Sequence, residues 1–288
     1  MRATYRVVEL CQALAVSRSG YYRWRRGKAG ARRRQNRLVL AEIKRIHADR
    51  HTRCYGSPRM SVELNHRGFR CSVNRVARLM KQNALRACRG RSYRPKTTRQ
   101  DPRSLPSPNH LAEAPDPTGP GQIMVSDITY VPTRQGWLYL AVVMDLFGRV
   151  IQGYKVAESL ASGLVVSALR QAGNRVGTIH KALFHSDRGC QYTSHQVREQ
   201  LSEFGWIQSM SAAGYCYDNA TCESLLASLK SECFPQNGVF ETKRQARLAM
   251  FDYIETFYNK RRRHSSLGYL SPEEFLKKHF QNQNHNLT

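Results

Sequence analysis

Ile123-Met124-Val125-Ser126-Asp127-Ile128-Thr129-Tyr130-Val131 is rich in residues that favour β-strands, and its setting decides the fold class. A turn around Gln135-Gly136 follows it, and then the apolar run 137–144. A second turn, at Phe147-Gly148, leads into a third strand-like stretch, 150–156. Three such stretches at hairpin spacing predict that a sheet begins with antiparallel strands.

Helices and strands alternate after this point. The pattern predicts a helix near 160–172, a strand at 182–185 and a helix at 194–204. Two longer helices are predicted at about 219–233 and 243–259. Strands first, followed by strand–helix alternation, are typical of an α/β fold whose sheet has mixed sense.

The charge of the chain is concentrated in its first part. The 288 residues include 46 Lys+Arg and 21 Asp+Glu, a formal net charge of +25. Residues 1–110 hold 28 basic and 5 acidic residues, a net of 28 − 5 = +23, and residues 111–288 hold 18 and 16, a net of +2. A merely solvated charged surface usually mixes both signs, so the first part is predicted to bind nucleic acid through its phosphates.

Proline marks a boundary between these two parts. Seven of the eleven prolines fall between 95 and 120, which predicts an extended linker and not a packed element. We therefore predict a basic helical region at 1–94, a linker at 95–120 and an α/β domain at 121–283.

Two helix-turn-helix units are predicted in the basic region, at about 5–27 and 38–86. In the first, an apolar helix is followed by a tight turn and by Ser17, which can cap a basic, aromatic helix. In the second, Pro58 suits a first helical turn and Ser72 can cap a third helix. The alternative is a pair of plain helical bundles, but the arginines on these helices favour DNA binding.

Three acidic residues of the α/β part lie in unusual positions. Asp127 is inside an apolar strand, Asp187 follows the strand at 182–185, and Glu223 lies in a predicted helix that also carries Lys230 on the same face. The interval between the last two acids is 223 − 187 − 1 = 35 residues. Such hard oxygen ligands suit Mg²⁺ or Mn²⁺, and two ions could activate an attacking oxygen at a phosphate and stabilise the leaving one. The alternative is that these are ordinary structural or surface carboxylates.

No segment predicts export or membrane insertion. The longest apolar run has eight residues, 137–144, against the roughly 20 that a membrane helix needs, and the N-terminus lacks a signal-peptide pattern. No G-x-x-x-x-G-K-[ST] loop for a nucleoside triphosphate is present. We expect a cytoplasmic protein that acts on nucleic acid and has no membrane partner.

Several ordered motifs resemble those of insertion-sequence transposases of the OrfB type in the IS-three group, within the retroviral-integrase-like superfamily. The motifs are Ser126-Asp127-Ile128-Thr129-Tyr130, His185-Ser186-Asp187-Arg188-Gly189, Asp218-Asn219-Ala220-Thr221-Cys222-Glu223 and the tail Tyr258-Asn259-Lys260-Arg261-Arg262-Arg263-His264-Ser265-Ser266-Leu267-Gly268-Tyr269-Leu270-Ser271-Pro272. The stretches 14–22 and 55–59 resemble the N-terminal part of the same family.

The resemblance implies a ribonuclease-H-like fold, a D-D-E catalytic triad of Asp127, Asp187 and Glu223, and two bound Mg²⁺ or Mn²⁺ ions. It implies strand cleavage by water at the ends of an insertion sequence, followed by strand transfer through the freed 3′-hydroxyl. Lys230 matches a basic residue credited with holding the DNA end. The implied partners are double-stranded DNA, further copies of the chain, and an upstream-frame DNA-binding protein, as fusion or partner. The implied location is the nucleoid of a bacterial cytoplasm.

Two positions depart from the family pattern, which usually has Asn at Gly121 and Trp at Met124. Met124 is expected to be a packing position, since Met adapts to irregular gaps. His185 could contact substrate or metal-bound water, but orienting the strand end is the favoured role. Asp145 is expected to be structural, with Arg149 as a possible partner.

Nine arginines are expected to contact DNA, together with Lys230. They are Arg18, Arg23, Arg25, Arg59, Arg75 and Arg78 in the basic region and Arg261, Arg262 and Arg263 near the C-terminal end. For the last three the alternative is a solvated helix end. Two rival functions stay open: a non-catalytic DNA-binding repressor or inactive remnant, and a nuclease that cuts without joining.

Overall fold

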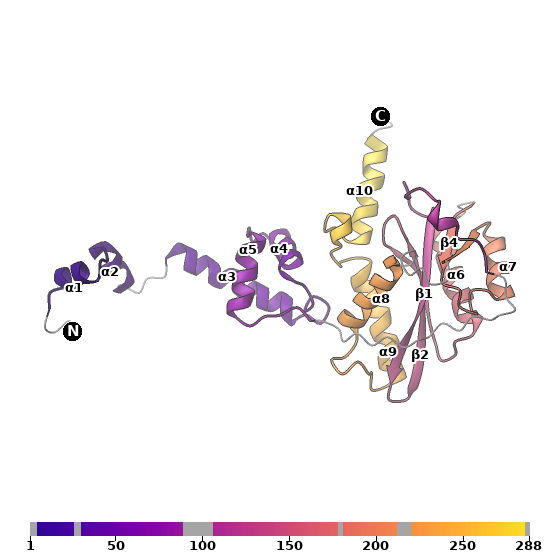
Figure 1. The fold of residues 1–288 in the computed structure, drawn as a ribbon, viewed down its shortest axis with the longest axis horizontal. Coiled ribbons are helices and arrows are strands. Elements are labelled where there is room, and N and C mark those ends of the chain that lie inside the picture. Colours follow the sequence, from indigo (N-terminus) through magenta and orange to yellow (C-terminus); the bar gives the residue numbers. More distant parts are fainter. Residues whose placement is uncertain (1–4, 26–29, 89–105, 178–180, 212–219, 286–288) are drawn as a thin grey trace.

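The computed structural model describes residues 5–25, 30–88, 106–177, 181–211 and 220–285. Five helices form its N-terminal part (Figure 1): α1 (Val7–Ala13), α2 (Arg18–Arg25), α3 (Ala31–Ala48), α4 (Ser57–His66) and α5 (Val73–Gln82). The Ser72 hydroxyl accepts a hydrogen bond from the Arg75 N–H and caps α5, as predicted. The third helix begins well before the predicted residue 38, because the basic residues ahead of the apolar face are also good helix formers.

The C-terminal part is built on one mixed sheet. Its strands are β1 (Ile123–Thr133), β2 (Gly136–Asp145), β3 (Ile151–Ala157), β4 (Leu183–Ser186) and β5 (Ile207–Met210). They lie in the order β3-β2-β1-β4-β5, with the first three antiparallel and with β4 and β5 parallel to β1. The predicted fold class is confirmed: a ribonuclease-H-like mixed sheet with flanking helices, preceded by an all-α region.

Helices cover both faces of this sheet. One face carries α6 (Ser162–Val176) and α7 (His195–Glu203), and the other carries α8 (Ala220–Cys233), α9 (Lys243–Phe251) and the π-helix η3 (Asp252–Tyr258). Helix α10 (Pro272–His285) projects beyond the sheet in Figure 1, and its Phe275 packs against Phe147 in the turn after β2. Alternate residues of β2 belong to two cores: Leu140 and Val142 pack with α8 and η3, whereas Ala141 and Val143 pack with α6 and α7. Burial on both faces explains why this strand reads as one apolar run.

Three elements differ from the sequence predictions. Strand β5 and helix α10 were not predicted, and the predicted helix 243–259 changes to π-helical geometry at Asp252. Strand β5 has only four residues, which are too few to show a recognisable alternation of apolar and polar side chains.

The predicted linker is only partly an extended connection. Residues 95–105 lie outside the described residues. In the remainder, Ser107 Oγ donates to Gln208 Oε1 at 2.8 Å, Met210 N–H donates to the Pro108 carbonyl at 3.2 Å, and Leu111 N–H donates to Ser209 Oγ at 3.1 Å. The prediction of an unpacked segment is therefore corrected for 107–111, which pairs along the outer edge of β5. The domain limits at 94/95 and 120/121 stay predictions.

The α3–α5 unit packs against the helices of the sheet domain. His51 stacks on Phe257 with ring centroids 4.8 Å apart, and its Nε2 lies 2.7 Å from Asp252 Oδ2, which also pairs with Arg50. The Arg263 N–H donates to the Tyr55 hydroxyl at 3.2 Å. One continuous cluster of buried apolar residues runs from α3, α4 and α5 through β1 and β2 to α8, α9 and η3.

Among the helices of the described ranges, none combines the length and apolar character that crossing a membrane requires.

Candidate active site

Asp127 lies near the middle of β1, on the sheet face that α8 covers. Side chains alternate along a strand, and Val125 and Val131 of β1 belong to the core shared with α8, so Asp127 points to that side. The helix contacts β1 directly. Locally, the Ile128 N–H donates to Asp127 Oδ1 at 2.7 Å.

Asp187 is brought beside Asp127 by the parallel pairing of β1 and β4. Val125 of β1 pairs with His185 of β4. Asp127 lies two residues after Val125, and Asp187 lies two residues after His185. The Gly189 N–H donates to Asp187 Oδ1 at 3.0 Å, which fixes the turn after β4. Arg188 is directed elsewhere, since its Nε donates to the Ser211 carbonyl at 2.7 Å.

Glu223 and Lys230 come from α8. Glu223 is exposed in the first turn, and Lys230 is half-buried in the last part of the helix. A separation of seven residues is close to two turns, so the two side chains share a helix face. Burial lowers the pKa of Lys230, and the charge of Asp127 opposes this shift, which places the ammonium group within the electrostatic reach of the acid.

Two other carboxylates lie close enough to Asp127 to affect its pKa. Burial, followed by the charge of Asp187, raises the pKa of Asp127 to about 7; the charge of Glu223 acts in the same direction, while the Ile128 N–H and Lys230 oppose the shift. All three acids also act on the buried Cys222 thiol, whose pKa lies well above its usual value chiefly because of burial. The three predicted residues therefore share one region of the structure.

The donor set suits a hard divalent cation better than any other group. Three carboxylates with one ammonium nearby leave an excess of negative charge that a Mg²⁺ or Mn²⁺ ion would neutralise, and the oxygen donors match the preference of these ions. In the part of the chain that the structure describes, no three His, Cys, Asp or Glu side chains already surround a common point for an ion. The residue types of the three acids nevertheless fit such an ion.

The other strand-end residues have structural roles. His185 is fully buried and bridges two strands, with Nδ1 at 2.9 Å from Ser209 Oγ and Nε2 at 3.0 Å from Ser211 Oγ, as the favoured interpretation expected. Asp145 accepts hydrogen bonds from the N–H groups of Gly121 and Gly148. Gly121 has a φ of +83°, a conformation that favours glycine, so its departure from the family pattern suits the local backbone.

Met124, the second departure, is fully buried in the core on the α6 side of the sheet. This confirms the expected packing role. Sequence reasoning missed Tyr192, whose buried hydroxyl lies 2.9 Å from Ser126 Oγ beside Asp127. A tyrosine in a loop of otherwise polar residues carried no signal that it would reach this strand.

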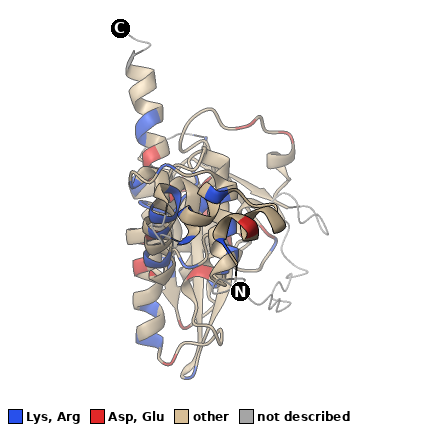
Figure 2. Ribbon diagram, turned by 90° about the vertical axis from the view of Figure 1, so that its left-hand side faces the viewer, with Lys and Arg blue, Asp and Glu red and all other residues tan. Residues whose placement is uncertain are grey.

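The predicted DNA-contact arginines separate into two groups. In the basic region, Arg18, Arg23, Arg25 and Arg78 are exposed, whereas Arg75 is half-buried and donates to Asn36 Oδ1 at 2.9 Å. Figure 2, which views the molecule from the side of these helices, shows Lys and Arg spread over them and few Asp or Glu.

The arginines near the C-terminal end do not form the solvent-facing track that the sequence predicted. Arg261 is exposed, but Arg262 and Arg263 are only 3% and 6% exposed. Arg262 forms two hydrogen bonds with Glu232, and Arg263 pairs with Glu63 and Glu274. The expectation is corrected for these two residues, because Arg262 pairs with the buried Glu232 and Arg263 pairs with the partly buried Glu63 and Glu274.

Comparison with protein families supports this assignment of the fold and the site region. Residues 117–216 and 223–280 match models of the integrase core domain, and residues 33–93 match the HTH-like domain. The first two ranges contain all three acids, so the class of protein is an integrase-core protein with an N-terminal DNA-binding-type module.

The particular family follows from full-length relatives. The chain is 38% identical over 286 residues to the transposase InsF for insertion sequence IS3A of Escherichia coli K12, covering 96% of both chains. It is also 38% identical over 277 residues to the 31 kDa protein of insertion element IS600 of Shigella sonnei, covering 94% of this chain and 99% of the relative. The chain belongs to the IS3-type family of insertion-sequence transposases.

Solved structures with a similar arrangement are more distant. The catalytic core domain of BIV integrase has 16% identity and a TM-score of 0.38, covering 57% of this chain and 99% of that domain. The integrase in the simian T-cell lymphotropic virus intasome has 14% identity and a TM-score of 0.41, covering 68% of this chain and 65% of that one. These values are too low to inform individual residues, and the family assignment depends on the full-length relatives.

Proposed function

We propose that the chain catalyses metal-dependent DNA cleavage and strand transfer at the ends of an insertion sequence. The observation that carries the proposal is the convergence of Asp127 and Asp187 from neighbouring parallel strands with Glu223 from α8, inside an integrase-core domain. Families of this kind exchange one phosphodiester for another, so no nucleoside triphosphate is required.

In this proposal the three carboxylates hold divalent cations, Mg²⁺ or Mn²⁺, with two ions as the expected number. When bound, such ions lower the pKa of an attacking hydroxyl and stabilise the charge on the leaving oxygen. In the cleavage step a water oxygen bonds to phosphorus and the 3′-oxygen departs with a proton. In the joining step that 3′-hydroxyl bonds to another phosphorus and releases a second 3′-oxygen.

Lys230 and the exposed arginines of the basic region bind DNA in this proposal and do not react. The half-buried ammonium of Lys230, on the same helix face as Glu223, is placed to contact a phosphate of the element end. The exposed Arg18, Arg23, Arg25 and Arg78 supply phosphate contacts from the HTH-type region. Action as an oligomer on DNA, and fusion or pairing with an upstream-frame DNA-binding protein, belong to the same proposal.

Substitution of the acids tests this function. Asp127→Ala, Asp187→Ala or Glu223→Ala should abolish Mg²⁺-dependent nicking and joining of an element-end oligonucleotide, since each removes an oxygen ligand. DNA retention by the basic region should persist. Glu113→Ala, at an exposed acid before the sheet, is the matched control and should keep both activities.

The same assay separates the rival functions. Specific binding by the unaltered chain without any metal-dependent nicking would favour a repressor or an inactive remnant. Cleavage without joined products would favour a nuclease. Strand transfer that survives the loss of a triad acid would overturn the assignment of the site.

A further inference from the structure

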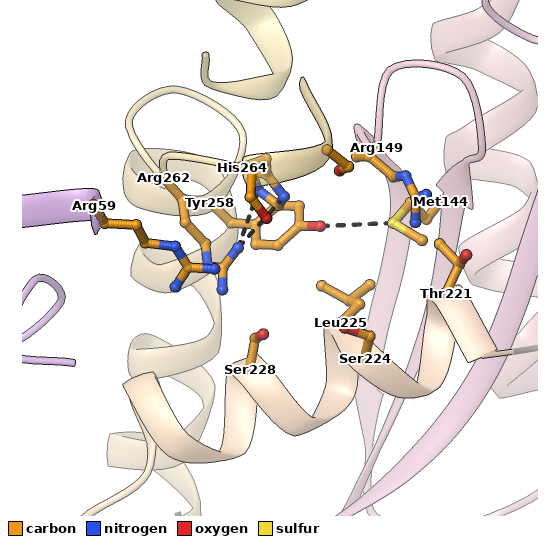
Figure 3. Close-up of a pocket in the computed structure, with 12 residues that line it drawn as sticks. Arg59, Met144, Arg149, Thr221, Ser224, Leu225, Ser228, Tyr258, Arg262 and His264 are labelled. Atoms are coloured by element: carbon orange, nitrogen blue, oxygen red, sulfur yellow. Dashed lines mark hydrogen bonds between the residues drawn. The ribbon is translucent and has the colours of Figure 1, made fainter. Parts of the chain in front are cut away.

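A cavity of about 110 Å³ lies beside α8 and is ringed by positive charge. Arg59 reaches it from α4, Arg149 from the turn before β3, and Arg262 and His264 from the segment after η3 (Figure 3). A single water needs only about 10–15 Å³, so the cavity admits a larger ligand. Arg59 and Arg262 are among the arginines that the sequence predicts to contact DNA, but no role described above involves the cavity that they share with Arg149 and His264.

The positive groups of the cavity exceed their acidic partners. Arg262 donates to both oxygens of Glu232, at 2.7 and 2.8 Å, and Arg59 lies 3.5 Å from the same carboxylate. One carboxylate thus serves two guanidinium groups. Arg149 is near Asp145, whose oxygens already accept from two backbone N–H groups. Three positive charges therefore face two negative ones.

His264 does not offset this positive potential. It is 8% exposed, and one ring nitrogen lies 3.3 Å from Arg262 Nη1, which is a donor. Burial, followed by the charges of Arg262, Arg59 and Arg149, lowers the pKa of His264 to about 2, so the ring is neutral at ordinary pH. An anion in the cavity would experience the charges of the same three arginines.

Hydroxyl donors complete the lining. Thr221, Ser224 and Ser228 follow one another along α8 at spacings of three and four residues, so they present one face of the helix (Figure 3). Ser265 and Ser266, which follow His264, also line the cavity and are exposed to solvent. Guanidinium and hydroxyl groups together are the donors that proteins use for phosphate.

We propose that this cavity is a binding site for a phosphate group and that a backbone phosphodiester of the bound DNA occupies it. That the phosphate comes from DNA rests on the proposed function, but the binding of a phosphate group by the cavity does not. Thr221 and Ser224 flank Glu223 in sequence, so a strand held here would be anchored on the helix that supplies the third acid. The site would thus position DNA in the space that α8 shares with the end of β2 and the segment after η3.

Inorganic phosphate tests the chemistry of the site. Thermal unfolding of the full chain is measured in EDTA against phosphate concentration, with chloride added to hold the ionic strength constant. Tm should rise with phosphate, and Arg149→Gln should weaken the apparent affinity by at least about tenfold, because one charged hydrogen-bond partner is lost. Arg149→Lys, which keeps the charge, should retain much of the response. Arg244→Gln removes an equal charge at an exposed position of α9 and should change nothing.

Duplex DNA tests the source of the phosphate. The affinity of the same variants for an element-end duplex is measured at several salt concentrations, again in EDTA, so loss of catalysis cannot affect the result. Arg149→Gln should reduce the slope of log K against log[salt] by about 0.9, the value for one phosphate contact, whereas Arg244→Gln should not.

The outcomes are distinct. A phosphate response without a change in slope would assign the site to a free oxyanion and overturn the DNA part of the proposal. If Arg149→Gln alters neither the phosphate response of Tm nor the salt slope of DNA binding, the whole proposal is overturned. If Arg149→Gln unfolds in buffer alone, Ser228→Asp supplies the second variant, since a carboxylate inside the cavity should abolish both responses while α8 keeps its length. Failure of strand transfer with intact phosphate binding would contradict the proposed function only.

Discussion

At the scale of single residues, the carboxylate of Glu232 connects three parts of the chain. Its side chain is 3% exposed and accepts hydrogen bonds from Nε and Nη2 of Arg262 and from the Tyr253 hydroxyl at 2.8 Å. Arg59 of α4 lies 3.5 Å away. A buried ion pair contributes little against an apolar replacement, but the loss of one partner leaves an uncompensated buried charge.

Glu232→Gln should therefore destabilise the protein strongly. The amide keeps the shape of the side chain and one acceptor for Tyr253 but leaves the buried Arg262 charge unpaired, at a cost of about 3–5 kcal/mol. Urea denaturation measures the difference. The control is Glu241→Gln, whose partner Arg134 is 2.8 Å away and whose side chains are 60% and 67% exposed, so the cost should stay below about 1 kcal/mol. Equal costs for both variants would contradict this account.

The acidic residues of the candidate site could be predicted from the sequence, whereas the buried ion pair of Arg262 could not. Asp127 could be predicted because an acid inside an apolar strand is costly and therefore conspicuous. Asp187 was conspicuous because it follows a strand, and Glu223 shares a helix face with Lys230; the motif resemblance then supplied the roles of these three residues. Arg262 was misread, because its partner Glu232 is 30 residues away and only the fold brings the two together.

At the scale of elements, the contact between β3 and α6 has no room for a side chain. A Cβ at Gly153 of β3 would lie 2.8 Å from the Ala172 nitrogen and still closer to the Ala168 carbonyl oxygen. Both atoms belong to the helix backbone, so a rotamer change cannot relieve the clash. This close approach holds α6 against the edge of the sheet.

Gly153→Ala should separate these elements and destabilise the protein by at least about 1–3 kcal/mol, the usual cost of overpacking. The matched control is Gly163→Ala in α6, where a Cβ has nothing within 4 Å. That variant should be neutral or stabilising by up to about 1 kcal/mol, since Ala favours helices. Denaturant midpoints for both variants give the comparison, and an unaffected Gly153→Ala protein would show that α6 can shift freely.

Elements were predictable where the pattern was long and local. The strands β1, β2 and β3 and the helices α4 and α5 carry strong alternation or clear caps, and their predicted positions agree closely with the structure. Strand β5 is short, and its pairing with 107–111 depends on residues about 100 positions away. The change to a π-helix at Asp252 likewise follows from packing that no local window contains.

At the scale of the whole molecule, the charge and the core divide the chain differently. Charge separates a strongly basic region from a nearly neutral one, but the apolar core is continuous across α3–α5 and the sheet domain. The two outermost helices, α1 and α2, lie apart from the rest in Figure 1, and α2 has no buried residue. The basic α3–α5 unit thus shares one apolar core with the sheet domain, while α1 and α2 contribute no residue to that core.

A shared core predicts that α3–α5 and the sheet domain unfold together. Phe257 of η3 is fully buried and stacks on His51 across the contact, so Phe257→Ala should cost about 3–5 kcal/mol and lower the Tm of both parts equally. Scanning calorimetry should show one transition before and after the change, with the calorimetric and van't Hoff enthalpies equal. Leu248→Ala, at a side chain of α9 that is 59% exposed, should leave the transition in place. Two transitions, only one of them shifted by Phe257→Ala, would mean that the basic region folds independently. The contact through His51 would then not couple the stability of the basic region to that of the domain that holds the acidic site.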